Sequence, residues 1–175
     1  MSSPDRPIWQ AAVAFAARKH RNQNRKDKIT PYVSHVFRVA MTVRDVFGCS
    51  DPAIIAAALL HDTIEDTTTD YDELEEQFGS DIAGLVAAMT KNMALPEKQR
   101  EAEYDARLAA ADWRARLVKL ADVYDNYCDW SSTIDLRLEE MRDKCRRAIE
   151  LARPDVAAHP ETQKAVSLVA VLAGV

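Results

Sequence analysis

The sequence is poor in the residues that build turns and crosslinks. Its 175 residues include only four glycines and three cysteines, so little turn chemistry is available for β-hairpins. The cysteines form no CxxC pair and are odd in number, which argues against a disulfide scaffold or a zinc–thiolate site and favours a reducing compartment. The N-terminus lacks the order of a signal peptide, and no apolar run is long enough to cross a membrane. We therefore expect a cytoplasmic protein with no membrane partner.

An excess of positive charge is also absent. The formal net charge is −5, so nothing points to a nucleic acid as the main partner, although a local basic patch would suffice for a small anionic ligand. Apolar residues make up 47% of a chain that is long enough to bury one hydrophobic core. The abundance of Ala, Leu, Glu and Arg favours helices. Composition thus predicts a single all-α domain over residues 1–175.

Apolar spacing and capping signals place the helices of this domain. Thr30-Pro31, Asp51-Pro52 and Thr133 are expected helix starts, because Ser, Thr and Asp cap helices and Pro suits the first turn. Gly48 and Gly79 are expected helix ends. The expected helices span residues 8–20, 31–47, 52–62, 71–78, 81–91, 98–111, 113–130, 134–152 and 160–172. They predict a helical bundle without internal repeats.

Two polar residues close the most apolar of these helices. His61 and Asp62 follow AIIAAALL, and burying them is costly unless they are paired or bind a metal ion. Glu65 and Asp66 lie four residues further along, so all four groups are close neighbours. Crowded carboxylates repel one another and oppose the helix dipole at a C-terminal end, whereas a divalent cation resolves both problems. A metal site is therefore favoured over the alternative, a solvated acidic helix end.

A metal ion would need further ligands from elsewhere in the chain. His35 lies early in the second helix, where it could also be a core histidine, and Asp122 lies in the apolar stretch LVKLADVYDN, where an acid requires a partner. With His61 and Asp62 they would supply two imidazoles and two carboxylates. Such a set without thiolate suits octahedral Mn²⁺, with Fe²⁺ and Mg²⁺ as the alternatives.

Several strings of the sequence together carry a family resemblance. They are HRNQNRKDKITPYVSH, AALLHDTIEDT, FGSDIAGLVAAMTK and LVKLADVYDN. The order H…HD…D and these strings resemble the HD hydrolase domain of RelA/SpoT proteins over about residues 11–129. The short chain, with C-terminal helices over 133–175, is similar to the stand-alone small alarmone hydrolases that include the metazoan SpoT homologs.

The resemblance implies a single HD-domain helical bundle that removes the 3′-pyrophosphate from (p)ppGpp-type nucleotides with Mn²⁺. The residues that match the family's metal ligands are His35, His61, Asp62 and Asp122. Those that match its water-activating pair are Glu65 and Asp66. Those that match its nucleotide contacts are Arg25, Lys26 and Asn126. A chain of this length leaves no room for a synthetase, so we expect hydrolysis without synthesis.

The chain departs from the family pattern at three positions. Val123, Asp125 and Cys128 stand where RelA/SpoT-like chains usually carry a basic residue, an aromatic or His, and an Arg. An acid at 125, next to the expected nucleotide, could favour an amino-bearing base edge. The adenine alarmone (p)ppApp is therefore a candidate substrate beside (p)ppGpp.

Other functions and roles stay open at this point. The metal site would equally suit another HD phosphohydrolase, such as a nucleotidase or an NADPH 2′-phosphatase, while a non-catalytic nucleotide sensor is disfavoured because Glu65 and Asp66 are both present. His20 is expected to be structural and His159 to lie on the surface. Thr90-Lys91 should close a helix, and Lys119 should either neutralise the acidic cleft or form a structural ion pair. The residues do not indicate an oligomeric state.

Overall fold

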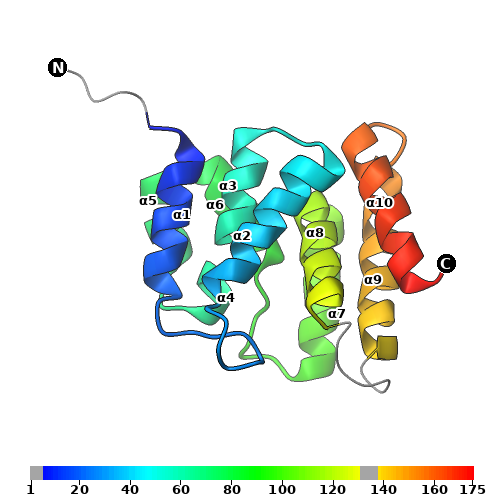
Figure 1. Cartoon of the computed structure of the whole chain (residues 1–175), viewed down its shortest axis with the longest axis horizontal. Coiled ribbons are helices and arrows are strands. Elements are labelled where there is room, and N and C mark those ends of the chain that lie inside the picture. Colours follow the sequence, from blue (N-terminus) through cyan, green and yellow to red (C-terminus); the bar gives the residue numbers. More distant parts are fainter. Residues whose placement is uncertain (1–5, 131–137) are drawn as a thin grey trace.

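The computed structural model describes residues 6–130 and 138–175. Within these ranges the chain is helical (Figure 1) and carries no strand beyond an isolated bridge between Asn24 and Pro31. The helices are α1 Ile8–Lys19, α2 Val33–Met41, α3 Pro52–Leu60, α4 Thr63–Asp66, α5 Tyr71–Phe78, α6 Ser80–Met89, α7 Glu97–Ala110, α8 Trp113–Trp130, α9 Leu138–Ala152 and α10 Pro160–Ala173, with a π-helical turn over Thr42–Phe47 and a 3₁₀ turn over Arg153–Asp155. The predicted all-α class is confirmed. Among the described residues, no helix combines the length and apolar character that crossing a membrane requires.

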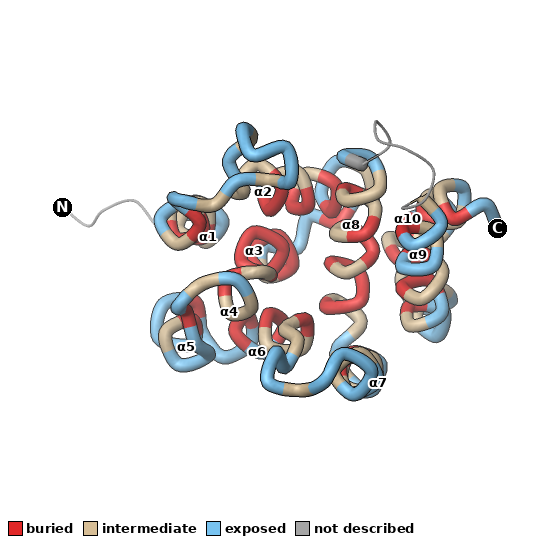
Figure 2. Tube along the Cα trace, turned by 90° about the horizontal axis from the view of Figure 1, so that it is seen from below, coloured by how far each residue is buried: buried red, intermediate tan, exposed pale blue. Residues whose placement is uncertain are grey.

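α3 forms the centre of the fold. Every residue from Ile54 to Leu60 is buried, and in Figure 2 this buried segment lies among α1, α2, α6 and α8. The helix needs no polar stripe because neighbours cover it on all sides. Asp51 caps it as predicted, accepting hydrogen bonds from the N–H groups of Ala53 at 2.7 Å and Ile54 at 3.2 Å. α3 therefore delivers the residues after Leu60 to the interior.

α8 joins the two parts of the bundle. One side packs against α2, α3 and α6, and the other packs against α9 and α10, which form the right-hand layer of Figure 1. Leu117 and Leu120 are fully buried in this helix. Near its start, Arg116 holds Asp155 with two hydrogen bonds of 2.6 and 2.9 Å. The packing of α8 on α3 places the middle of α8 opposite the end of α3.

The predicted start of the second helix is wrong. Thr30 does not cap it, because its hydroxyl and its N–H both bond to Asp27, at 2.5 and 2.9 Å. The loop instead folds back on itself, with the N–H of Tyr32 donating to the carbonyl of Gln23 at 2.8 Å. The helix begins only at Val33. The loop is consequently pinned beside the start of α2.

Other predicted helix ends agree with the structure to within a few residues. Asp70 caps α5 through the N–H of Glu73 at 2.9 Å, and Gly48 ends the helical turn over 42–47 in the left-handed conformation with φ 88°. The bounds of α8 are those predicted. The expected cap at Thr133 and the helix start at 134 lie outside the described residues, and α9 is described from Leu138 onward.

Candidate metal centre and active site

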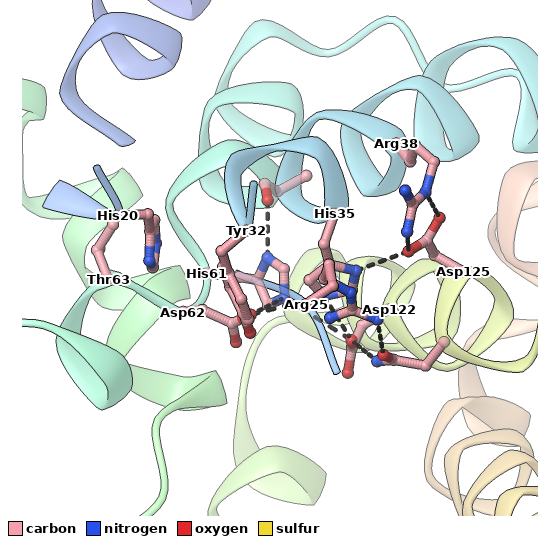
Figure 3. Close-up of polar contacts among 12 residues, drawn as sticks. His20, Arg25, Tyr32, His35, Arg38, His61, Asp62, Thr63, Asp122 and Asp125 are labelled. Carbon is pink, nitrogen blue, oxygen red and sulfur yellow. Dashed lines mark hydrogen bonds and ion pairs between the residues drawn. The ribbon is translucent and has the colours of Figure 1, made fainter. Parts of the chain in front are cut away.

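Two imidazoles and two carboxylates meet where α2, the end of α3 and α8 come together (Figure 3). His61 Nε2 lies 3.1 Å from Asp62 Oδ2 and 3.8 Å from Asp122 Oδ1. His35 Nε2 lies 3.3 Å from Asp122 Oδ1 and 3.6 Å from Asp62 Oδ2. Ligand atoms of His35, His61 and Asp62 all fall within 4.8 Å of one another. The structure thus brings together all four residues that were predicted to bind a metal ion.

The orientation of the two imidazoles suits a cation. His61 Nδ1 is bonded to the carbonyl of Ala58 at 2.8 Å, and His35 Nδ1 to Asp125 at 2.7 Å. Both rings therefore turn Nε2 toward the carboxylates. Among the described residues, the buried His61 Nε2 makes no well-directed hydrogen bond although Asp62 Oδ2 lies 3.1 Å away, so this nitrogen is left available to a cation. Two such nitrogens facing two carboxylates form a donor set that fits a divalent ion.

The histidines and carboxylates of the centre stabilise each other's charged forms. Burial by itself raises the pKa of Asp62, but the neighbouring His61 outweighs it and holds that pKa well below its usual value. Burial also acts against ionised Asp122, whose pKa is nevertheless lowered by Lys119 and by both histidines. In turn, the ring of His61 is desolvated, yet the two carboxylates raise its pKa. A metal ion would therefore compete with protons for the same nitrogen atoms.

Glu65 and Asp66 lie beside this centre on the short helix α4. α3 ends at Leu60, so α4 is a separate turn, and Thr63 joins the two by donating its hydroxyl to the Leu60 carbonyl at 2.6 Å. Glu65 Oε2 accepts the Lys91 N–H at 2.7 Å, and burial raises the pKa of Glu65. Partial loss of water and the nearby Asp62 charge raise the pKa of Asp66. The predicted water-activating pair is thus adjacent to the predicted ligands.

A cleft of about 160 Å³ opens onto these groups. Its lining is mostly polar and consists of Tyr32, His35, His61, Asp62, Glu65, Asp66, Met89, Lys91, Tyr104, Lys119, Asp122 and Asn126. Lys119 lines the cleft and contacts Asp122 at 2.8 Å. It therefore carries charge opposite to that of the acidic cleft and also forms an ion pair, which are the two roles predicted for it. Thr90 closes α6, as predicted, while Lys91 also reaches the cleft. Two lysines therefore bring positive charge to this cleft, Lys119 paired with Asp122 and Lys91 paired with Glu101.

Of the three predicted nucleotide contacts, Asn126 lines the cleft and Arg25 is bonded to Asn126. Arg25 donates to Asn126 Oδ1 at 2.8 Å and to Asp129 at 3.0 Å, with its guanidinium 5.5 Å from the Tyr32 ring centre. Asn126 in turn donates to Asp122 Oδ1 at 2.5 Å. Lys26 is exposed on the same loop, and neither Arg25 nor Lys26 is part of the cleft lining. Arg25 is linked to the candidate metal centre through Asn126 and Asp122.

The expected contact of Asp125 with a base is wrong. Only 5% of Asp125 is exposed, and its carboxylate is held by His35 and by Arg38 at 2.6 and 2.9 Å. Val123 is buried in the core, and Cys128 is exposed. The acid at 125 therefore faces the back of a candidate ligand and is absent from the cleft lining.

Sequence reasoning missed two supporting residues on either side of His35. The Tyr32 hydroxyl donates to Asp62 Oδ2 at 2.6 Å, and Arg38 holds Asp125. Both lie three residues from His35, and this spacing on one helix face is the signal that could have identified them.

The remaining histidines fall outside the centre. His20 is buried, stacks on Tyr32 and bonds to Gln23 at 2.6 Å, which agrees with a structural role. His159 is not a plain surface residue, because it is half-buried and its ring stacks on Trp113 with centres 3.8 Å apart.

Known proteins resemble this chain over most of its length. The family model described as HD domain matches residues 12–147. A Xenopus tropicalis protein named guanosine-3′,5′-bis(diphosphate) 3′-pyrophosphohydrolase MESH1 is 40% identical over 128 residues, which cover 73% of this chain and 72% of that one. The Danio rerio protein of the same name is 43% identical over 130 residues, covering 74% and 72%. A solved structure of a metazoan ortholog of SpoT, reported to hydrolyse ppGpp, superposes with a TM-score of 0.82 at 27% identity, covering 99% of both chains.

Proposed function

The chain belongs to the HD-domain family, among the relatives of metazoan SpoT, and is a metal-dependent phosphohydrolase; from this premise we propose that it removes pyrophosphate from the 3′ position of (p)ppGpp. One observation carries the proposal. Three elements far apart in the sequence deliver His35, His61, Asp62 and Asp122 to one point, with Glu65 and Asp66 beside it in the cleft. The names of the relatives supply the substrate class.

In this proposal His35, His61, Asp62 and Asp122 hold the metal ion, for which Mn²⁺ suits the donor set best. When bound, such an ion stabilises negative charge on phosphoryl oxygens and makes water more acidic. The hydrogen bond of Tyr32 to Asp62 and that of Asn126 to Asp122 orient the two carboxylates. The protein thus supplies a preorganised set of ligands rather than one assembled by the substrate.

Glu65 and Asp66 are proposed to receive the proton of the attacking water. The pKa of each is raised in the structure, which brings a carboxylate nearer to the range in which a general base works efficiently. The Lys91 N–H holds Oε2 of Glu65 at 2.7 Å, so Oε1 is the oxygen proposed to receive the proton. A nucleophile would therefore be activated on the side of the centre where α4 lies.

Arg25, Lys26 and Asn126 are proposed to contact the nucleotide. Arg25 lies over the Tyr32 ring and beside Asn126, a place from which a guanidinium can stack on a base or bond to phosphate. Asp125 gives no support to an adenine preference, because its carboxylate is used within the protein. We therefore propose the guanine alarmone, and (p)ppApp serves as the comparison.

The test is a panel of substrates offered to the purified chain with Mn²⁺. The substrates are ppGpp, pppGpp, ppApp, NADPH and simple nucleotides, and the released products are identified. Release of pyrophosphate from ppGpp with a GDP product supports the proposal. Release of phosphate from NADPH alone would favour the 2′-phosphatase, and turnover of simple nucleotides alone would favour a nucleotidase. Activity toward none of them would leave the alarmone proposal without support.

A further inference from the structure

His35 and His61 are supported from behind in different ways. His61 Nδ1 meets the neutral carbonyl of Ala58 at 2.8 Å. His35 Nδ1 meets the carboxylate of Asp125 at 2.7 Å. Asp125 comes from α8, 90 positions away in the sequence, and it stands where the family resemblance led us to expect a ring. The two candidate ligands are therefore not equivalent.

Arg38 fixes the Asp125 carboxylate. Its Nε donates to Asp125 Oδ1 at 2.6 Å and its Nη2 to Oδ2 at 2.9 Å, which is the two-pronged geometry that keeps a carboxylate ionised and in one rotamer. Arg38 itself is held by Asp129 Oδ1 at 3.3 Å. Because only 5% of Asp125 is exposed, water has little access to the bond with His35. In Figure 3 the Asp125 carboxylate lies between the His35 ring and the Arg38 guanidinium, on the side of His35 away from Asp62.

An ionised carboxylate at Nδ1 has two consequences for His35. It can only accept a hydrogen bond, so the neutral ring must carry its proton on Nδ1 and present the lone pair of Nε2 to Asp62 and Asp122. The Asp125 carboxylate also increases the basicity of His35 Nε2, as carboxylates behind metal-bound histidines do. A carbonyl, as behind His61, orients a ring but adds no full negative charge.

We propose that Asp125, locked by Arg38, is a positioning residue that aims His35 Nε2 at the metal ion and strengthens it as a ligand. The inference rests on the proposed metal centre. It assigns a role to an acid that sequence reasoning placed beside the base. It also explains why an acid is tolerated in the interior at position 125, since its charge is shared between His35 and Arg38.

The test compares Asp125→Asn with a matched control, Asp155→Asn. Asp155 also accepts two bonds from a single arginine, at 2.6 and 2.9 Å, and its side chain is 11% exposed against 6% for Asp125. It contacts Arg116 and is not in the cleft lining. Both variants lose a comparable buried ion pair, and only one of them touches a candidate ligand.

Two measurements separate positioning from stability. Mn²⁺ affinity is measured from the signal of free Mn²⁺ in electron paramagnetic resonance, and the ring ¹⁵N shifts of His35 are recorded in metal-free protein at a pH where the ring is neutral. Asp125→Asn should weaken Mn²⁺ binding about 10–100-fold and shift the ring ¹⁵N resonances of His35, because an amide oxygen can accept the Nδ1–H bond but offers the ring no full negative charge. Asp155→Asn should lower the melting temperature while leaving both readouts as in the wild type.

Wild-type Mn²⁺ affinity and unchanged His35 shifts in Asp125→Asn would overturn the inference. If that variant does not fold, Arg38→Gln replaces it, because the Arg38 side chain is 37% exposed and its loss still frees the carboxylate to rotate; unchanged affinity there would overturn the inference equally. Mn²⁺ binding without alarmone hydrolysis would remove only the proposed substrate. A wild-type chain that binds no Mn²⁺ would remove the metal centre and this inference together.

Discussion

Replacing Glu65 by Gln should separate catalysis from stability. The carboxylate lies next to the candidate metal centre and accepts the Lys91 N–H at 2.7 Å. Burial raises its pKa, the charges of Asp62 and Asp66 add to that shift, and the Lys91 bond opposes it. The ionised side chain is therefore held against an unfavourable environment, which is typical of functional groups.

The expected changes in stability and in kcat both follow from these contacts. Gln keeps the shape and the acceptor oxygen, so the Lys91 bond loses only its charge-assisted part, about 1 kcal/mol. Relief of repulsion from Asp62 and Asp66 offsets a similar amount, so the melting temperature should change by no more than about 4 °C. Loss of a general base should lower kcat by about 10²–10⁴-fold, which corresponds to about 2.7–5.4 kcal/mol of activation free energy.

The assay is initial-rate ppGpp hydrolysis at saturating Mn²⁺, together with thermal unfolding of the same samples. Glu73→Gln is the control, because Glu73 lies on α5, pairs with Lys19 at 2.7 Å and is not part of the cleft lining. This variant should keep the full rate. Asp66→Asn should also lose activity while it stays folded. Full activity in both Glu65→Gln and Asp66→Asn would refute their assignment. A stability loss above about 3 kcal/mol in Glu65→Gln would instead indicate a mainly structural carboxylate.

Three further perturbations examine the metal centre, an ion-pair cluster and the core. Mn²⁺ at 100 times its Kd should stabilise the chain by about 2.7 kcal/mol, seen as a melting-temperature rise that EDTA reverses and that His61→Ala abolishes; a rise that persists in this variant would contradict the site. Arg114 lowers the pKa of Asp81 and Asp112 below their usual value of 3.8. Its contribution to the free energy of unfolding is therefore present above pH 3.8 and is lost on acidification. The deficit of Arg114→Gln in unfolding free energy, at most about 1 kcal/mol near neutral pH, should therefore shrink as the pH falls below 3.8, and a deficit that grows instead would refute the reasoning. Leu117→Ala removes a fully buried side chain and should cost about 2–5 kcal/mol in urea unfolding; a cost below about 1 kcal/mol would contradict the packing.

Helix limits set by local bonds were predictable from sequence. Asp51 and Asp70 cap their helices through N–H groups two or three residues away, so spacing alone reveals them. Thr30 shows the limit of this reasoning. It has the character of a cap, but Asp27 three residues earlier takes both its hydroxyl and its N–H. Thr30 could either cap the helix or bond to Asp27, and the residue types alone do not show which of the two is more stable.

By itself, the sequence determined the helical class and one half of the candidate centre. His61, Asp62, Glu65 and Asp66 are neighbours because the chain between them is too short to separate them. The tertiary structure decided the other half. His35 and Asp122 arrive from α2 and α8 only after both helices pack on α3.

The same packing turned Asp125 toward His35 and left Asn126 facing the cleft. Adjacent residues on a helix point about 100° apart, so the rotation of α8 against α2 selects which of them meets His35 and which faces the cleft. Local spacing cannot specify that rotation, because it is set by the packing of α8 on α2 and α3 in a buried core that includes Leu117, Leu120 and Val39.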